Sequence, residues 1–411
     1  MTAIRDVTDQ AALTLEVDGD GVAWIVFDRP GSRVNLLTAD VFTVLDALLA
    51  EVEDGARAGR IRALVVRSGK DGSFFAGADV GEIASVSTED QGYRASREGQ
   101  RVFQRVASLP VPTVAAVDGL CLGGGTELIL ACRARIASDR PETRIGLPEI
   151  RLGILPGFGG TTRLPRLVGL TAALPMILTG SNARASKARR IGLVDEIVHP
   201  SILYRRAATL ALEGKRSAGA RRTLVAKVLD GPGAAVALRQ ARKQVMRETR
   251  GHYPAPLAAL DVIAQSRGAA LERALDIEAH ALGRLIVTDV SKNLVRVFHL
   301  MEGAKKAGPR DVEPRAVQKA AVLGAGVMGG GIAQLLAQRG CTVRLKDIDA
   351  GAIGHGLQHA RQLFDRSVKR KRMRKLDAVR AMNAISGTLE YTGFREVDIT
   401  IEAVVERLDV K

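Results

Sequence analysis

The stretch GLCLGGGTELILAC, residues 119–132, decides how the first half of the chain is interpreted. A short apolar segment leads into three glycines, and an apolar run with helical spacing follows them. Glycine lets a backbone adopt dihedral angles closed to other residues and approach a ligand closely. The free N–H groups at a helix start, together with the positive end of its dipole, favour developing negative charge. Glu127 falls in the first turn of this predicted helix, where an acid also simply stabilises the helix.

A second acid stands downstream, in the segment GLPEIRLGILPGFGGTTRLPR, residues 146–166. Glu149 is flanked by Pro and Ile, although a solvated loop carboxylate is an adequate structural explanation. A carboxylate buried in an apolar setting would have a raised pKa and could move protons near neutral pH. If Glu127 and Glu149 converge on one pocket, they form a workable acid–base pair.

Upstream, the segment FFAGADV, residues 74–80, supplies a loop of small residues after a predicted strand. Its backbone N–H groups could face the helix that the glycines begin. Strands, turns and helices alternate around these segments over the first 200 residues, which is an α/β pattern. We expect strands at 22–27, 61–67 and 113–117 and a helix at 38–52 that Thr38 caps.

Taken together, the segments resemble the crotonase (enoyl-CoA hydratase/isomerase) superfamily. The family pattern is an AGAD loop, a GGGxE helix start, an LPE segment and a PGxGGT loop. These motifs occur here, in that order, at 76–79, 123–127, 147–149 and 156–161. The resemblance covers roughly residues 12 to 200 and implies a crotonase-type ββα spiral domain that acts on a coenzyme A thioester.

By the same resemblance, the backbone N–H groups of Ala78 and Gly124 would form an oxyanion hole for the thioester oxygen. Glu127 and Glu149 would hold one water between them. The presence of both acids favours enoyl-CoA hydratase activity, with Δ3-Δ2 isomerisation left open. An oxyanion hole without the two acids could instead serve thioester hydrolysis or isomerisation.

A second constellation is AAVLGAGVMGGGIAQLLAQRGCTVRLKDID, residues 320–349. Its pattern predicts a strand, a turn with the glycines Gly324, Gly326 and Gly329, an apolar helix, and a second strand that ends near Asp347. The glycines would admit a pyrophosphate to the helix N-terminus. Asp347 would accept hydrogen bonds from the adenosine ribose and repel a 2′-phosphate, so NAD is favoured over NADP.

This segment resembles the NAD-binding domain of 3-hydroxyacyl-CoA dehydrogenases. Residues 398–411, DITIEAVVERLDVK, resemble that family's strand with its EAVxE motif, and the resemblance puts Glu406 at the nicotinamide half. Arg407 stands where the family usually has Asn. The family's dehydrogenase Ser, His and Glu would lie beyond Lys411, so we expect an incomplete Rossmann-type domain, with dehydrogenase activity only in a longer version.

The domain organisation predicted from these features has four parts. The order resembles that of the α subunits of multifunctional fatty-acid oxidation complexes, which implies a thiolase β subunit as partner and assembly into a homo-oligomer or complex. The parts are a hydratase domain at 1–200, a helical linking region at 201–304, a linker at 305–316 rich in charge and proline, and the start of a dinucleotide-binding domain at 317–411.

Composition argues against several other classes of protein, such as nucleic-acid-binding and membrane-spanning proteins. The net charge is +15, but the densest basic run, 366–375, contains no aromatic residue that could stack on bases, so nucleic-acid binding is disfavoured. Three cysteines without metal-ligand spacing fit a reducing cytoplasm, and there is no apolar stretch of about 18 residues to span a membrane. Two alternatives to the hydratase stay open: an NAD-dependent 3-hydroxyacyl-CoA dehydrogenase fragment, or a non-catalytic assembly module.

Overall fold

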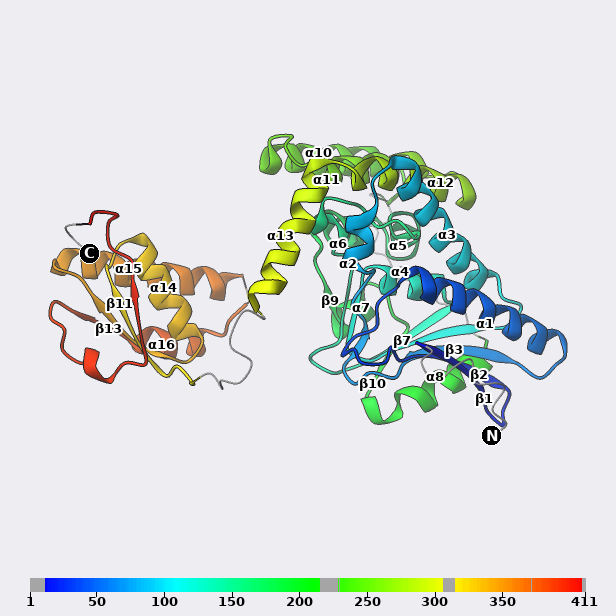
Figure 1. Cartoon of the computed structure of the whole chain (residues 1–411), viewed down its shortest axis with the longest axis horizontal. Helices are drawn as coiled ribbons and strands as arrows, with labels where there is room; N and C mark the ends of the chain where they lie inside the picture. The colour runs from blue at the N-terminus through cyan, green and yellow to red at the C-terminus, as the bar shows by residue number, and fades with distance from the viewer. Residues whose placement is uncertain (1–11, 215–227, 229, 306–314, 371, 409–411) are drawn as a thin grey trace. The chain divides into compact units, whose positions relative to one another are not determined.

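The computed structural model describes residues 12–214, 228, 230–305, 315–370 and 372–408. The chain divides into two compact units, residues 1–307 and 308–411 (Figure 1). Most of the linker predicted at 305–316 lies outside the described residues, and the four-part division stays a prediction. The two units are described one at a time.

The first unit is built on a six-stranded sheet in the order β1-β2-β3-β5-β7-β10, in which β1 and β2 pair antiparallel and the other neighbours pair parallel. The central strands are runs of Val, Leu, Ile and Ala buried on both faces, as expected for a parallel sheet covered on both sides. The strands are β1 (Leu13–Val17), β2 (Val22–Phe27), β3 (Ala63–Ser68), β5 (Thr113–Val117), β7 (Ala134–Ser138) and β10 (Glu196–Val198).

A second, four-stranded sheet has the order β4-β6-β8-β9. Neighbours β4, β6 and β8 pair parallel, and β9 pairs antiparallel with β8. The carboxyl ends of β4, β6 and β8 therefore meet at one edge, where loops can converge. The strands are β4 (Ser73–Phe75), β6 (Leu120–Leu122), β8 (Arg144–Gly146) and β9 (Ala183–Arg184).

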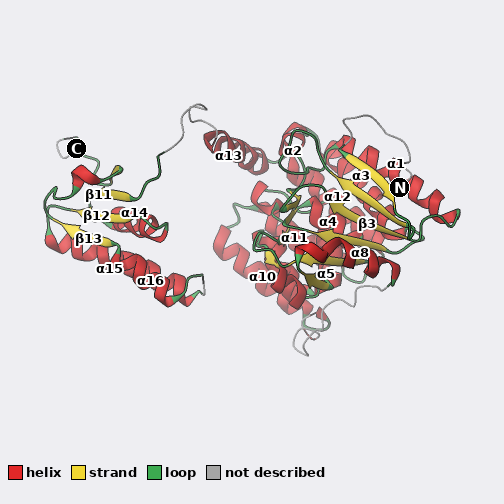
Figure 2. Ribbon diagram, turned by 90° about the horizontal axis from the view of Figure 1, so that it is seen from below, coloured by secondary structure: helices red, strands yellow, loops and turns green. Residues whose placement is uncertain are grey.

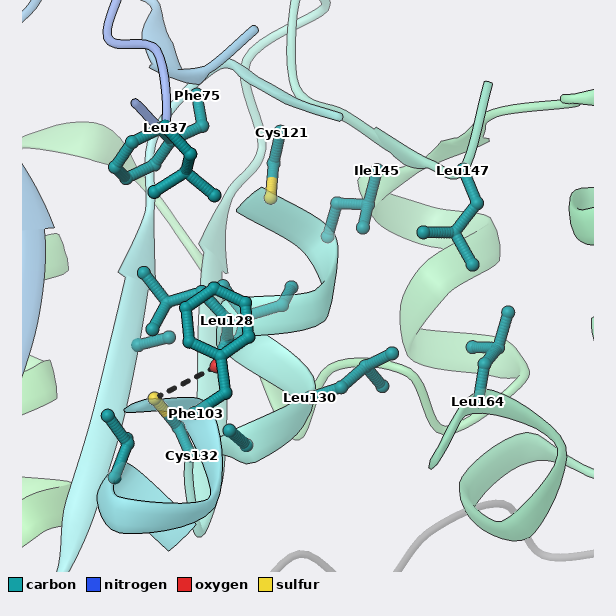
Figure 3. Packing of buried hydrophobic residues seen from close by; sticks show 14 of the residues in the cluster. Leu37, Phe75, Phe103, Cys121, Leu128, Leu130, Cys132, Ile145, Leu147 and Leu164 are labelled. Carbon is teal, nitrogen blue, oxygen red and sulfur yellow. Dashed lines mark hydrogen bonds between the residues drawn. The ribbon is translucent and has the colours of Figure 1, made fainter. Parts of the chain in front are cut away.

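Helices cover both faces of the six-stranded sheet. Figure 1 shows α1 and α3 on one side and α8 on the other, and each side has its own apolar cluster. The two leucines of α4, Leu128 and Leu130, pack into the larger cluster near Phe103 and Leu164 (Figure 3). The helices are α1 (Ala39–Arg57), α2 (Val80–Ser85), α3 (Glu89–Ser108), α4 (Gly124–Ala131), η1 (Glu149–Leu152), α5 (Gly160–Val168), α6 (Leu170–Thr179), α7 (Ala185–Arg190), η2 (Pro200–Ile202) and α8 (Leu203–Leu212).

The predicted α/β alternation is confirmed, with two boundaries shifted. Thr38 caps α1 as expected, because its side chain accepts from the N–H of Val41, but the helix runs five residues past the predicted end at 52. The next strand begins two residues later than expected, because the N–H groups of Arg60 and Ile61 bond to Gly55 O and close the turn after the helix.

The region predicted to be helical, 201–304, is mainly helical over its described residues, with short turns between the helices, and it belongs to the first unit (Figure 2). Two glycines bring α12 close to α3, since a Cβ on Gly283 would lie 2.5 Å from Glu89 O and one on Gly92 would lie 3.0 Å from the Cα of Gly283. Beyond α8, the described helices are α10 (Ala234–Thr249), α11 (Pro254–Ser266), α12 (Leu271–Ile286) and α13 (Asp289–Lys305).

The second unit holds a four-stranded, fully parallel sheet in the order β13-β12-β11-β14, an arrangement typical of a Rossmann-type domain. Across the described parts of the chain, each helix is too short or too polar to cross a lipid bilayer. The elements are β11 (Lys319–Leu323), α14 (Val327–Gln338), β12 (Thr342–Lys346), α15 (Ala350–Lys369), α16 (Lys375–Asn383), β13 (Ile385–Thr388), η3 (Phe394–Glu396) and β14 (Ile399–Glu402).

Candidate active site

Each parallel strand of the small sheet delivers one of the predicted site segments. β4 leads into the loop that carries Ala78, β6 leads into the glycines before α4, and β8 leads into η1, which begins with Glu149. The loops touch at the strand ends, because a Cβ on Gly123 would lie 3.4 Å from the Cα of Gly77 and 3.0 Å from Oε1 of Glu149. Gly77 has φ +115° and Gly123 has φ +55°, a backbone conformation that favours glycine at both positions.

The two backbone N–H groups predicted to form an oxyanion hole have no acceptor in the described part of the chain. Leu37 donates to Gly77 O and accepts from the N–H of Asp79, which leaves the N–H of Ala78 between these two bonds. Gly124 is the first residue of α4, so its N–H has no intrahelical acceptor. Both donors therefore remain available to an oxygen atom of a ligand.

Glu127 lies in the first turn of α4 and is 1% exposed. Its Oε1 accepts from the N–H groups of Phe158 and Gly160, each at 2.7 Å, so the carboxylate binds the loop before α5. Burial raises the pKa of Glu127 well above its usual range, and the charges of Glu149 and Glu278 raise it further, although the two N–H donors oppose the shift.

Glu149 is buried at its functional end, which contradicts the interpretation as a solvated loop carboxylate. Both carboxyl oxygens are shielded from solvent and have no hydrogen-bond partner among the described residues. Burial raises the pKa of Glu149 to about 8. Among the described residues, two N–H groups donate to Glu127, whereas no group lies within hydrogen-bond distance of the Glu149 carboxyl and only its own backbone N–H opposes the rise of its pKa. Charge is therefore better stabilised on Glu127 and the proton is better placed on Glu149.

A third acid, Glu278, belongs to the same cluster and was missed by the sequence analysis. It lies on α12 and is 0% exposed. Its carboxylate accepts from Gly159 N at 2.5 Å, from Gln100 Nε2 at 3.2 Å and from the hydroxyl of Thr161. The signal that could have found it is an acid in the middle of an apolar helical stripe, because an unpaired acid would be costly there.

The second unit carries the predicted dinucleotide motif between β11 and α14. A Cβ on Gly324, which has φ +93°, would lie 2.6 Å from Ala403 O, and one on Gly329 would lie 1.7 Å from Gly324 O. A Cβ on Gly326 would meet nothing within 4 Å. The first and third glycines are thus required by the fold, while the second leaves open space at the start of α14, as a bound pyrophosphate requires.

Two further predicted residues lie at the same edge of this sheet. Asp347 follows β12, and its carboxylate accepts from Ala325 N and Ile348 N, each at 2.7 Å. Glu406 follows β14, which pairs with β11, and its side chain is exposed. The edge of the parallel sheet therefore gathers the residues predicted to bind the cofactor.

The comparisons with known proteins match both units. Residues 18–252 match the family model of enoyl-CoA hydratase/isomerase, and residues 319–411 match that of the NAD-binding domain of 3-hydroxyacyl-CoA dehydrogenase. The fatty acid oxidation complex subunit alpha of Shewanella amazonensis is 40% identical over 397 residues. That alignment covers 95% of this chain but 56% of the curated relative, so this chain spans little more than half of that protein's length.

Solved structures confirm the predicted crotonase-type fold. An enoyl-CoA hydratase/isomerase from Xanthobacter autotrophicus Py2 is 25% identical with a TM-score of 0.51, covering 74% of this chain and 99% of that one. Human mitochondrial delta3-delta2-enoyl-CoA isomerase is 24% identical with a TM-score of 0.52, covering 72% of this chain and 100% of that one, a likeness in fold alone. The chain therefore belongs to the enoyl-CoA hydratase/isomerase family and carries, after that domain, the NAD-binding domain of the 3-hydroxyacyl-CoA dehydrogenases.

Proposed function

We propose that the chain adds water across the double bond of a trans-2-enoyl-CoA thioester in fatty-acid β-oxidation. One observation carries this proposal: the buried carboxyl pair Glu127 and Glu149 lies at the strand edge where the N–H groups of Ala78 and Gly124 have no acceptor among the described residues. Acyl-CoA chemistry of this kind needs an acid, a base and donors for a developing oxyanion, and the edge supplies all three.

The two N–H groups bind the thioester carbonyl oxygen. As water attacks, negative charge moves onto this oxygen and forms an enolate, so the donors stabilise the transition state more than the ground state. One such donor contributes about 3–4 kcal/mol in a dry site. The positive end of the α4 dipole, at Gly124, adds to the same effect.

The carboxyl pair moves the protons. Glu127, whose charged form the N–H groups of Phe158 and Gly160 stabilise, accepts a proton from the water that attacks Cβ. Glu149, whose carboxyl has no hydrogen-bond partner among the described residues, gives its proton to Cα. The pair thus begins and ends with one proton, and its transfer between the two acids restores the starting state.

Isomerisation of a 3-enoyl-CoA to the 2-enoyl form is a second activity of the same site. The supporting observation is the carboxyl of Glu149, which has no partner among the described residues and, in its ionised form, can take a proton from Cα and return it to Cγ. Only one acid is needed for that shift, so isomerisation should survive loss of Glu127 better than hydration does.

A spectroscopic assay tests the proposed function. The chain mixed with crotonyl-CoA should remove the absorbance of the conjugated enoyl thioester, and a 3-enoyl-CoA substrate should instead produce that absorbance. A chain that leaves crotonyl-CoA unchanged would refute the hydratase proposal. Reduction of NAD with 3-hydroxyacyl-CoA by the isolated chain would favour the dehydrogenase alternative.

In the second unit we propose an NAD site. Gly324, Gly326 and Gly329 would receive the pyrophosphate at the start of α14, and Asp347 would bind the adenosine ribose and disfavour a 2′-phosphate. Glu406 would lie at the nicotinamide half. Bound NAD would supply a hydride acceptor, while the residues of this unit would bind and orient it.

Assembly and location are also proposals. The matching relatives are named subunits of a complex, which supports a partner subunit here, and we propose a thiolase β subunit together with a homo-oligomeric or complex state. Co-expression with a thiolase subunit, followed by size-exclusion chromatography, tests the partnership. The three cysteines are free thiols, which is consistent with the proposed cytoplasmic location.

A further inference from the structure

We propose that Glu278 is a positioning residue of the hydratase site, holding the loop 156–161 in the geometry that binds Glu127; this inference rests on the proposed function. Glu278 stands on α12, beyond residue 252, where the match to the hydratase/isomerase family model ends. The region predicted to be a linking segment would therefore contribute to catalysis as well as to packing.

The geometry divides three consecutive N–H groups between two carboxylates. Phe158 N and Gly160 N donate to Glu127, each at 2.7 Å, and the intervening Gly159 N donates to Glu278 at 2.5 Å. Gly159 has φ +111°, so this alternation depends on a backbone conformation that favours glycine. Without Glu278 the central N–H would be buried without a charged acceptor, and the loop would be free to rotate its donors away from Glu127.

Other contacts fix Glu278 itself. The hydroxyl of Thr161, on the loop side, donates to Oε2. On the other side, Gln100 of α3 donates to Oε1 at 3.2 Å and also to Gly157 O at 3.0 Å, so one amide holds both the acid and the loop. Such mutual restraint is what a catalytic group requires, because small displacements of reacting groups are costly.

The charge of Glu278 also affects the pKa values of Glu127 and Glu149. Among the described residues, the charged or titratable groups that face it are Glu127 from α4, Glu149 from η1 and Arg163 from α5, while α3 contributes the neutral Gln100. Burial raises the pKa of Glu278 to about 7, and its negative charge raises the pKa of both Glu127 and Glu149. Loss of that charge should therefore make the pair release its remaining proton at lower pH.

Three substitutions separate charge from shape. Glu278→Gln keeps the size and one carbonyl oxygen for Gly159 N–H but removes the charge, Glu278→Asp keeps the charge on a shorter side chain, and Glu278→Ala removes both. With crotonyl-CoA we expect kcat to fall about 100-fold in the alanine variant, with KM nearly unchanged, and partial rescue by aspartate. The glutamine variant should move the basic limb of the kcat–pH profile down by about one pH unit.

The matched control is Glu272→Gln, an exposed acid on α12 that pairs with Arg97 at the surface, and it should behave like the wild-type chain. A kcat–pH profile of Glu278→Gln that superposes on the wild-type profile would overturn the inference, as would a loss of activity that only follows a loss of folded protein by circular dichroism. A wild-type chain that does not hydrate crotonyl-CoA would refute the proposed function itself, so the two failures are distinguishable.

Discussion

The molecule contains two strand–glycine–helix turns, at 120–131 and 319–338, that share one local design and differ in what surrounds them. Both place free N–H groups and a positive helix end at the carboxyl edge of a parallel sheet. In the first, Glu127 follows in the opening turn and the helix start is buried throughout. In the second, there is no acid in the opening turn of α14, and a Cβ on Gly326 would meet open space.

This contrast indicates that the glycine turn by itself creates only an anion-binding position. Burial and neighbouring carboxylates turn the first position into a site that can move protons, because they raise the pKa of Glu127 well above its usual range and that of Glu149 to about 8. The open approach in the second turn suits a ligand that brings its own charge, such as a pyrophosphate. Four perturbations test this contrast.

The double variant Glu127→Gln, Glu149→Gln should give the largest effect. A general acid or base typically contributes about 10²–10⁴-fold, so removal of both should lower hydration of crotonyl-CoA by about 10⁴-fold or more. Glutamine keeps the volume of each side chain and leaves a carbonyl oxygen for the N–H groups of Phe158 and Gly160. The matched control is Glu142→Gln in the exposed turn before β8. Normal turnover by the double variant would refute the mechanism.

The next effect comes from the helix start itself, through Gly124→Ala. The added Cβ would lie 2.6 Å from Cδ1 of Leu37, the residue whose backbone bonds bracket Ala78, so both proposed oxyanion donors should shift. We expect kcat to fall about 10²–10³-fold, the loss associated with one misplaced donor. Gly19→Ala is the control, because a Cβ there meets nothing within 4 Å. Equal activity in the two variants would argue against an oxyanion role for this turn.

The pH dependence of kcat should distinguish the buried carboxyl of Glu149 from an ordinary surface carboxylate. Burial raises the pKa of Glu149 to about 8, so the protonated acid prevails below that pH and is lost as the pH rises through it. We therefore expect kcat for crotonyl-CoA to fall about thirtyfold between about pH 7 and about pH 9.5. The profile is measured on protein whose folding at each pH is checked by circular dichroism. A kcat that stays constant through this range would mean that the reaction does not use a protonated carboxyl.

Much of this contrast could be predicted from the sequence, because it depends on local order. The glycines, the position of Glu127 one turn later and the alternation of apolar strands are properties of short segments. The end of β5 also follows from Asp118-Gly119, and the end of β11 from the glycines that follow it. Three parallel strands then bring Ala78, Gly124 and Glu149 to one edge, as the motif order implied.

Other parts of the site depend on contacts between segments far apart in the chain. Glu278 lies 119 residues after Gly159, whose N–H it accepts, and no local pattern specifies that pairing. The surroundings of Glu149 could not be predicted either, because its lack of hydrogen-bond partners among the described residues follows from how α4, η1 and the glycine loop pack. The sequence predicted that residues 201–304 are helical, but not that an acid of α12 would contact the loop 156–161.

The smallest expected effect belongs to the open turn, through Gly326→Ala. Because a Cβ there meets nothing within 4 Å, the unit should fold normally, whereas one on Gly329 would lie 1.7 Å from Gly324 O and should disrupt the turn. If the open space receives a pyrophosphate, calorimetric titration of Gly326→Ala with NAD should show affinity reduced by about tenfold, or ~1.4 kcal/mol. Hydration of crotonyl-CoA should not change. Unaltered NAD binding in this variant would mean that the second turn shares only its backbone shape with the first, and that its glycine spacing serves the packing of α14 on the sheet.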